Sequence, residues 1–112
     1  MTAAHRRSTV ERSAPVFGAL GDPTRLRLVA SLSARGPQSI TGLTRGTKLT
    51  RQAVTKHLRV LEGAGLVRGK RLGRESRWEL DSAGLDVARG YLDLVSARWD
   101  EALERLRDLV EE

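Results

Sequence analysis

Residues 49–61 have the sequence LTRQAVTKHLRVL, and this stretch determines the expected fold. Thr50 belongs to the residue types that cap helix N-termini, because its side-chain oxygen can accept a hydrogen bond from a backbone N–H of the first turn. After it, Val54, Leu58 and Leu61 follow at i, i+4 and i+7, which is the spacing of one helix face. The stretch therefore predicts an amphipathic helix that buries these three side chains.

The opposite face of this helix would carry Gln52, Thr55, Lys56 and Arg59. Gln can pair with adenine, Lys and Arg can donate to guanine or phosphate, and Thr offers a hydroxyl and a methyl group, so these residue types suit the major groove of DNA. The alternative is an ordinary solvated helix face, where the same residue types are common. Two observations favour DNA. No acidic residue interrupts this face before Glu62, and a capped helix and a tight turn precede the stretch.

Helices are also predicted on the N-terminal side, with order beginning near Ala14. A first helix ends at Gly21, and Asp22 followed by Pro23 then supplies an N-cap and a proline at the first helical position, where its missing N–H is harmless. This second helix is expected to end near Gly36. Its expected buried face consists of Leu26, Val29, Ala30 and Leu32.

A short third helix is expected after Ser39, its N-cap, although its threonines and glycines have poor helix propensity. A tight turn around Lys48 and Leu49 then leads to the helix of residues 49–61. Lysine is unfavourable in the left-handed backbone conformation, so the bend is expected either at Lys48 with strain or at Gly46, and the register of the third helix stays open. Helix, tight turn and helix together have helix-turn-helix spacing.

Residues 66–80 predict a β-hairpin whose turn is at Gly73. Val67, Trp78 and Leu80 are expected to point inward. The hairpin is rich in cations, namely Arg68, Lys70, Arg71, Arg74 and Arg77. Such charges can simply protect an edge strand from aggregation. They can also hold a DNA backbone beside the predicted recognition helix, and on that interpretation the tip residues Arg71 and Arg74 are expected to matter most.

A last helix is predicted from Ser82 nearly to the end of the chain. Apolar residues follow one another in steps of three and four, at Leu92, Val95, Trp99, Ala102, Leu106 and Leu109. Packing within the chain is one explanation. Dimerisation is favoured, because a helix of this length would overhang a small body and leave the apolar row exposed.

Composition predicts one domain of the mainly α class with a small β-hairpin. The expected parts are an N-terminal mobile arm at 1–13, with the frayed start of a helix as the alternative, a DNA-binding body at 14–81 and a dimerisation helix at 82–112. Residues 1–80 carry 16 Lys and Arg against 5 Asp and Glu, a net +11, whereas residues 81–112 carry 4 against 9, a net −5. This asymmetry favours nucleic acid over anionic lipid as the partner of the body. Neither a membrane span nor a signal peptide is apparent, so a cytoplasmic protein without a membrane partner is expected.

Three stretches resemble the ArsR-type (ArsR/SmtB-like) winged helix-turn-helix repressors: LGDPTRLRL at 20–28, LTRQAVTKHLRVL at 49–61 and EGAGLV at 62–67. The resemblance extends from about Val16 to Leu109. It implies five helices with a β-wing, and a homodimer built on the first and last helices that binds an inverted-repeat operator, usually to repress transcription.

The predicted site residues combine these interpretations. Contacts with double-stranded DNA are expected from Thr50, Arg51, Gln52, Thr55, Lys56, His57, Arg59, Lys70, Arg71, Arg74 and Arg77. Dimer contacts are expected from Val16, Phe17, Leu20, Leu92, Val95, Trp99, Ala102, Leu106 and Leu109.

Metal sensing is not expected. Family members that sense metals use cysteines near the third helix or histidine and carboxylate ligands on the last helix, and this chain has no cysteine and no histidine there. His5 lies in the expected arm, and His57 has no second ligand type at suitable spacing. No cofactor is expected, and the effector stays open.

The sequence also lacks a nucleophile elbow and a glycine-rich phosphate loop, so an enzyme is not expected. The open alternatives are a non-specific architectural nucleic-acid binder and a winged helix that binds protein. Gln52 and Thr55 favour base readout, because an architectural binder can use Lys and Arg throughout.

Overall fold

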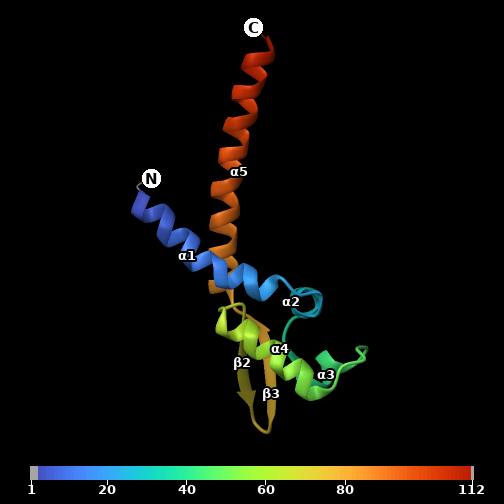
Figure 1. The fold of residues 1–112 in the computed structure, drawn as a ribbon. Helices are drawn as coiled ribbons and strands as arrows, with labels where there is room; N and C mark the ends of the chain where they lie inside the picture. Colours follow the sequence, from blue (N-terminus) through green and yellow to red (C-terminus); the bar gives the residue numbers. More distant parts are fainter. Residues whose placement is uncertain (1–2, 112) are drawn as a thin grey trace.

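The computed structural model describes residues 3–111, with side chains from Thr9 onward. Within this range the chain forms five helices and a small antiparallel sheet (Figure 1). The elements are α1 (Ala3–Leu20), α2 (Pro23–Arg35), β1 (Gln38–Ser39), α3 (Ile40–Thr44), α4 (Arg51–Gly63), β2 (Val67–Leu72), β3 (Glu75–Leu80) and α5 (Ser82–Glu111). The predicted mainly helical class with five helices and a β-wing is confirmed.

Helix α1 includes residues 3–13, so the expectation of an arm there is wrong and the alternative, the start of a helix, agrees with the structure. Ser13 is only 2% exposed, and its Oγ donates a hydrogen bond of 2.6 Å to the backbone oxygen of Thr9. Ser13 thus continues the buried face of Val16 and Ala19 toward the N-terminus. The predicted start near Ala14 depended on the spacing of apolar residues. Because the buried residue at position 13 is a polar serine, that spacing did not extend further toward the N-terminus. The side chain of His5 lies outside the described part.

Helix α2 begins as predicted, with Asp22 as N-cap and Pro23 in the first turn, and it ends at Gly36, whose φ is 78°. Its predicted buried face is confirmed at Leu32, which is buried, and at Val29, which packs half-buried against the core. It is wrong at Leu26, which is 51% exposed, and at Ala30, which is exposed, whereas Leu28, which was not predicted, is buried. Leu26 and Leu28 point in directions about 200° apart around the helix axis, so leucines occur on both sides of α2. The spacing of apolar residues alone therefore could not show which side is buried.

The sheet has the order β1-β3-β2 and is antiparallel throughout. β2 pairs with β3 from Val67 opposite Leu80 to Leu72 opposite Glu75, and the turn contains Gly73 with a φ of 64°. This confirms the predicted hairpin. The two-residue strand β1, which pairs Gln38 with Trp78, was not predicted, because so short a strand has no pattern of its own.

The hydrophobic core lies beneath α4. Val54, Leu58 and Leu61 are fully buried, as predicted. They pack with Leu28, Leu32, Leu43, Leu66, Val67, Trp78, Val16, Ala19 and Ala88 from the surrounding elements. Helix α4 is therefore held by α1, α2 and α3 and by the hairpin strand β2, so its outward face has a fixed orientation.

The start of α5 is attached to the segment after α4 by a close backbone contact. The amide of Gly84 donates a hydrogen bond of 2.7 Å to the backbone oxygen of Gly65. A Cβ at Gly84 would lie 2.6 Å from that oxygen, closer than real Cβ atoms approach a backbone atom. This contact requires glycine in the first turn of a 30-residue helix.

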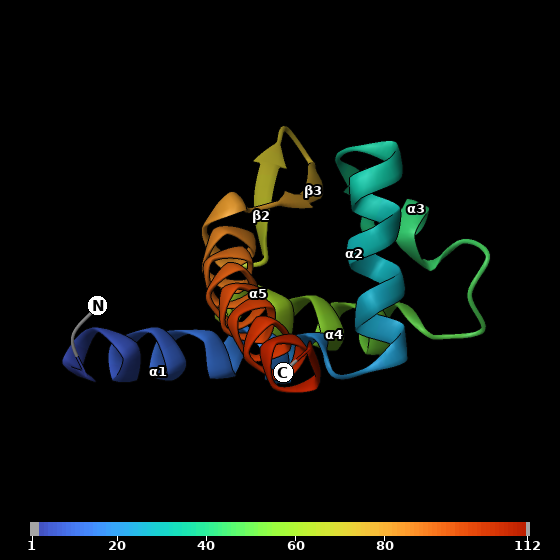
Figure 2. The ribbon, with the colours of Figure 1, turned by 90° about the horizontal axis from the view of Figure 1, so that it is seen from above.

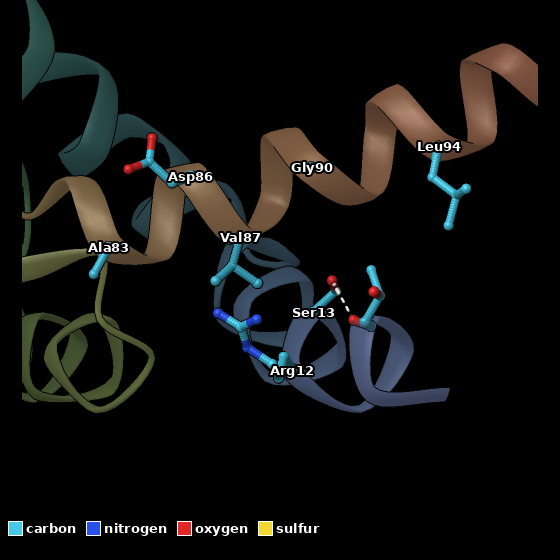
Figure 3. A pocket seen from close by; sticks show the side chains of 8 residues that line it. Arg12, Ser13, Ala83, Asp86, Val87, Gly90 and Leu94 are labelled. Carbon is cyan, nitrogen blue, oxygen red and sulfur yellow. Dashed lines mark hydrogen bonds between the residues drawn. The ribbon is translucent and has the colours of Figure 1, made fainter. Parts of the chain in front are cut away.

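Helix α5 packs on α1 near its start and then projects beyond the rest of the chain (Figures 1 and 2). Phe17 and Tyr91 meet edge to face, with ring centroids 5.5 Å apart. Figure 3 shows the hollow between these helices, of about 480 Å³, with Arg12 and Ser13 on one side and Val87 on the other. The molecule measures 66 Å along its longest axis and 20 Å along its shortest.

Candidate nucleic-acid interface

Helix α4 presents a polar row opposite its buried face. Arg51, Gln52 and Lys56 are exposed, whereas Thr55 is half-buried. With Ile40 these four residues line a shallow hollow of about 410 Å³ at the junction of α3 and α4. The hollow places two cations, an amide and a threonine methyl group on one surface, which is a suitable set of groups for a base edge and its phosphate.

The two threonines of this surface already use part of their hydrogen-bonding capacity. Thr50 caps α4, because its Oγ1 accepts a hydrogen bond of 3.1 Å from the amide of Ala53. Its hydroxyl proton can still be donated to an anion. Thr55 Oγ1 donates at 2.8 Å to the backbone oxygen of Arg51, which leaves the methyl group and the oxygen lone pairs of Thr55 for a ligand.

His57, a predicted DNA contact, faces α2 instead of the outward row. Its Nδ1 lies 3.4 Å from Arg25 Nη1 and 3.9 Å from Asp22 Oδ2. Arg25 Nε in turn donates a hydrogen bond of 2.6 Å to the backbone oxygen of Ala19. His57 therefore connects the recognition helix to the capped start of α2, and its side chain is half-buried there.

The same cluster affects the ionisation of Asp22. The hydrogen bond from the backbone amide of Arg25 lowers the pKa of Asp22 below its ordinary value and outweighs partial desolvation, which acts in the opposite direction. Electrostatic interactions with Arg25 and His57 lower the pKa of Asp22 further. Asp22 is thus a charged cap at the helix N-terminus, where a negative charge is stabilised.

Arg59 is exposed but engaged with its neighbours. Its Nη1 lies 2.9 Å from Glu62 Oε1, and its guanidinium carbon lies 5.3 Å from the ring centroid of Trp78. Trp78 belongs to β3 and is 4% exposed. Arg59 therefore links α4 to the wing through an ion pair and a cation–π contact.

The predicted wing cations fall into different environments. Arg68 Nε pairs with Glu79 Oε1 across the hairpin at 2.7 Å, and Glu79 raises the pKa of Arg68. Arg71 Nε donates a weak hydrogen bond of 3.3 Å to the backbone oxygen of Gly73. Arg74 lies in the turn itself, between the ends of the two strands, and is exposed.

Lys70 and Arg77 stand directly opposite each other in the β2–β3 register. Both are exposed, and neither makes an ion pair with a described residue. Like charges in directly opposed positions destabilise a hairpin. An anion bound between the two side chains would reduce this repulsion. The pair is therefore better explained as a phosphate-binding site than as charges that only protect a strand edge.

The predicted dimer residues also differ in accessibility. Val16 is buried inside the chain, so it offers no surface to a partner, whereas Phe17 and Leu20 are half-buried. Val95 and Ala102 are half-buried as well. The remaining residues of the row are open: Leu92 at 54%, Trp99 at 65%, Leu106 at 58% and Leu109 at 70% exposed.

The sequence did not predict the contacts of His57 with α2 or of Arg59 with Trp78. Both join residues from different elements, and local spacing carries no information about such pairs. In the described part of the chain, no helix has the length and apolar character to cross a membrane. No cluster of three metal-ligating side chains occurs within that same part.

Comparisons with known proteins agree with this geometry. A family model described as a helix-turn-helix domain matches residues 20–70. The HTH-type transcriptional regulator Rv2034 of Mycobacterium tuberculosis is 35% identical over 104 residues, which cover 93% of this chain and 94% of that protein.

Solved structures extend the similarity to the whole fold. The ArsR-like transcriptional regulator from Rhodococcus sp. RHA1 has a TM-score of 0.77 and 34% identity, over 91% of this chain and 95% of that one. The homodimeric winged helix-turn-helix DNA-binding domain Mb0332 from Mycobacterium bovis, a possible ArsR-family regulator, has a TM-score of 0.65 and 28% identity. That match covers 93% of both chains.

Proposed function

Because the chain belongs to the ArsR-type family of winged helix-turn-helix transcriptional regulators, we propose that it represses transcription as a homodimer bound to an inverted-repeat operator. DNA binding and a role in transcription follow from the family. The homodimer, the symmetry of the operator and the negative sign of regulation are the parts proposed for this chain.

The proposed base contacts come from Gln52, Thr55 and Lys56 on the outward row of α4. Thr50 and Arg51 at its N-terminus would meet phosphate, because backbone N–H groups and the helix dipole favour anions there. In the wing, Lys70, Arg71, Arg74 and Arg77 would hold the DNA backbone. His57 and Arg59 are proposed to position α4 against α2 and the wing, given their contacts with Asp22 and Trp78.

The observation that carries the proposal is the exposed apolar row of α5 in a chain whose other end is strongly basic. Trp99, Leu106 and Leu109 are all more than half exposed, which is costly for a free monomer. A two-fold pair of α5 helices would cover them. The same symmetry relates two copies of α4, so the DNA site would be an inverted repeat with half-sites about one helical turn apart.

Fluorescence anisotropy with the full chain tests the proposal. Binding to the DNA upstream of its own gene is compared with binding to a scrambled duplex across a salt series. A repressor of its own gene should prefer the upstream DNA by about a thousandfold or more at physiological salt. Sedimentation of the complex should give two chains per duplex.

Two outcomes would contradict this function. Equal and steeply salt-dependent binding to both duplexes would indicate an architectural binder, because phosphate contacts alone carry no sequence information. If the chain binds neither duplex at low salt, the DNA-binding interpretation is wrong, and the remaining alternative is a winged helix that binds protein.

A further inference from the structure

A hollow of about 550 Å³ lies behind the helix-turn-helix turn, between α2 and the segment from α3 to the start of α4. Leu28 and Leu43 line it, and each is only 4% exposed. Its polar lining includes four cations, Arg27, Arg35, Arg45 and Lys48. An apolar floor beneath a cationic rim is the pattern of a site for a small molecule with an anionic group.

The charges around this hollow are all of one sign. No Asp or Glu occurs among its lining residues. None of the four cations forms an ion pair or a side-chain hydrogen bond with another described residue. By contrast, Arg59 and Arg68 of the DNA-binding face each have a carboxylate partner. The rim therefore has donors available for an external anion, and binding one would relieve repulsion among the cations.

Neutral groups in the wall add directed donors. Ser31 Oγ accepts a hydrogen bond of 3.0 Å from Gln38 Nε2, so its own proton is available to a ligand. Gly46 has a φ of 85° and no atom within 4 Å of its Cβ position, which leaves the turn side of the hollow open. Of the two alternatives for the bend, Gly46 and Lys48, the chain bends at Gly46.

We propose that this hollow binds a small organic anion, with its carboxylate or phosphate group at Arg27, Arg45 and Lys48 and its apolar body on Leu28 and Leu43. The volume lies within the ordinary range for small-molecule sites, roughly 300 to 1,000 Å³. Arg45 also lines a neighbouring hollow with Arg51, so the bound anion would sit next to the N-terminal end of α4. None of the lining residues of the site belongs to α5, so the site is separate from the exposed apolar row of that helix.

Anionic oxygen at this rim could come from a free small molecule or from a DNA phosphate. The apolar floor favours the free molecule, because a duplex backbone has only small sugar C–H groups between charged phosphates and no extended apolar body to place on two buried leucines. Binding of a small anion to the protein without DNA separates the two sources. Because that experiment contains no DNA, its outcome does not depend on whether the proposed operator is correct.

The test is a titration of the isotope-labelled full chain with phenyl phosphate, followed by the backbone amide resonances of Gly42 and Gly46. We expect saturable shifts at these amides. In the double variant Arg27→Gln, Arg45→Gln the dissociation constant should rise about tenfold or more, since charge-assisted hydrogen bonds are lost. Both positions are exposed, so the fold should tolerate glutamine. Benzyl alcohol, which lacks the charge, should bind much more weakly.

Lys70→Gln is the matched control, because it removes one cation from the wing and leaves the hollow unchanged. It should lower duplex affinity while the phenyl phosphate titration stays as in the wild type. The proposal is overturned if the wild type shows no saturable shift, if the double variant binds phenyl phosphate unchanged, or if benzyl alcohol binds equally well. Loss of duplex affinity in the double variant, together with no phenyl phosphate binding by the wild type, would assign the rim to the DNA backbone.

Discussion

Lys56 and Arg74 are both exposed cations, but they occupy different kinds of position. Lys56 is on the outward row of α4, next to Gln52, where a donor can reach a base edge in the major groove. Arg74 is in the hairpin turn, where, in the proposed complex, it would reach backbone phosphate or a minor groove and no base edge of the major groove. The two residues should therefore contribute differently to affinity and to specificity.

We expect Lys56→Ala to weaken operator binding and to relax base preference, at a cost of about 1–3 kcal/mol for the preferred base pair. Arg74→Ala should weaken binding to all sequences similarly and reduce the salt slope by about one. Anisotropy with the operator and a panel of single-base variants, repeated at several salt concentrations, measures both quantities. The assignment of roles fails if the two variants change base preference equally.

Asp22 links stability to pH. Its pKa is lowered in the folded chain, chiefly by the amide hydrogen bond from Arg25. A carboxyl group of this kind stabilises the fold above its unfolded pKa, and that contribution is lost as pH falls through the lower folded value. Asp22→Asn keeps a capping side chain and removes the charge, so its melting temperature should be lower than that of the wild type at neutral pH.

The difference in melting temperature should begin to shrink as pH falls below about 4 and should close below the lowered pKa of folded Asp22, where the wild-type carboxyl group also becomes neutral. Thermal unfolding followed by circular dichroism at a series of pH values checks this. Asp93→Asn, at an exposed position on α5, is the control and should show a smaller difference at neutral pH. A gap that stays constant down to pH 2 would mean that the charge of Asp22 is not the cause.

At the scale of elements, the contact between Gly84 and Gly65 fixes where α5 leaves the body. Gly84→Ala should force these backbones apart and destabilise the fold by roughly 1–3 kcal/mol, the usual cost of overpacking. Gly90→Ala, in the same helix with no atom within 4 Å of its Cβ position, should instead stabilise by about 0.5–1 kcal/mol. Denaturant unfolding of both variants measures the difference. Equal effects would show that the close approach is not required.

Local chemistry explains which elements could be predicted. The caps Asp22, Ser39 and Thr50 were predicted because each acts through an amide three residues away. The hairpin was predicted because alternation and Gly73 are also local. The start of α1, the buried face of α2 and strand β1 depend on contacts with distant segments, so the pattern of neighbouring residues could not determine them.

The candidate site divides in the same way. The outward direction of Gln52 and Lys56 followed from helical geometry once Val54 and Leu58 were placed inside. The inward direction of His57 did not, because it depends on the position of α2 around Asp22. Likewise, the burial of Val16 depends on how α1 crosses the core, which the apolar stripe alone does not specify.

The whole molecule has two ends with different chemistry. The wing and α4 are basic, and α5, which begins at Ser82, carries half of the 14 acidic residues and projects away from them (Figure 1). An acidic helix near DNA would be repelled, so its position at the far end is compatible with a basic surface that approaches phosphate. The exposed apolar row of α5 is then available to a second copy without blocking the DNA-binding face.

Leu106 tests this arrangement, because it is 58% exposed and its replacement should leave the body of each chain folded. We expect Leu106→Ser to raise the dimer dissociation constant by about tenfold or more, since an apolar side chain of the row would lose its contact with the other copy in both partners. Sedimentation across a concentration series measures this change. Affinity for the inverted repeat should fall in parallel, whereas affinity for an isolated half-site should not change. Glu104→Ser, on the opposite side of the helix, is the control and should leave the dimer intact. If Leu106→Ser dimerises like the wild type, a surface other than this row of α5 holds the two copies together.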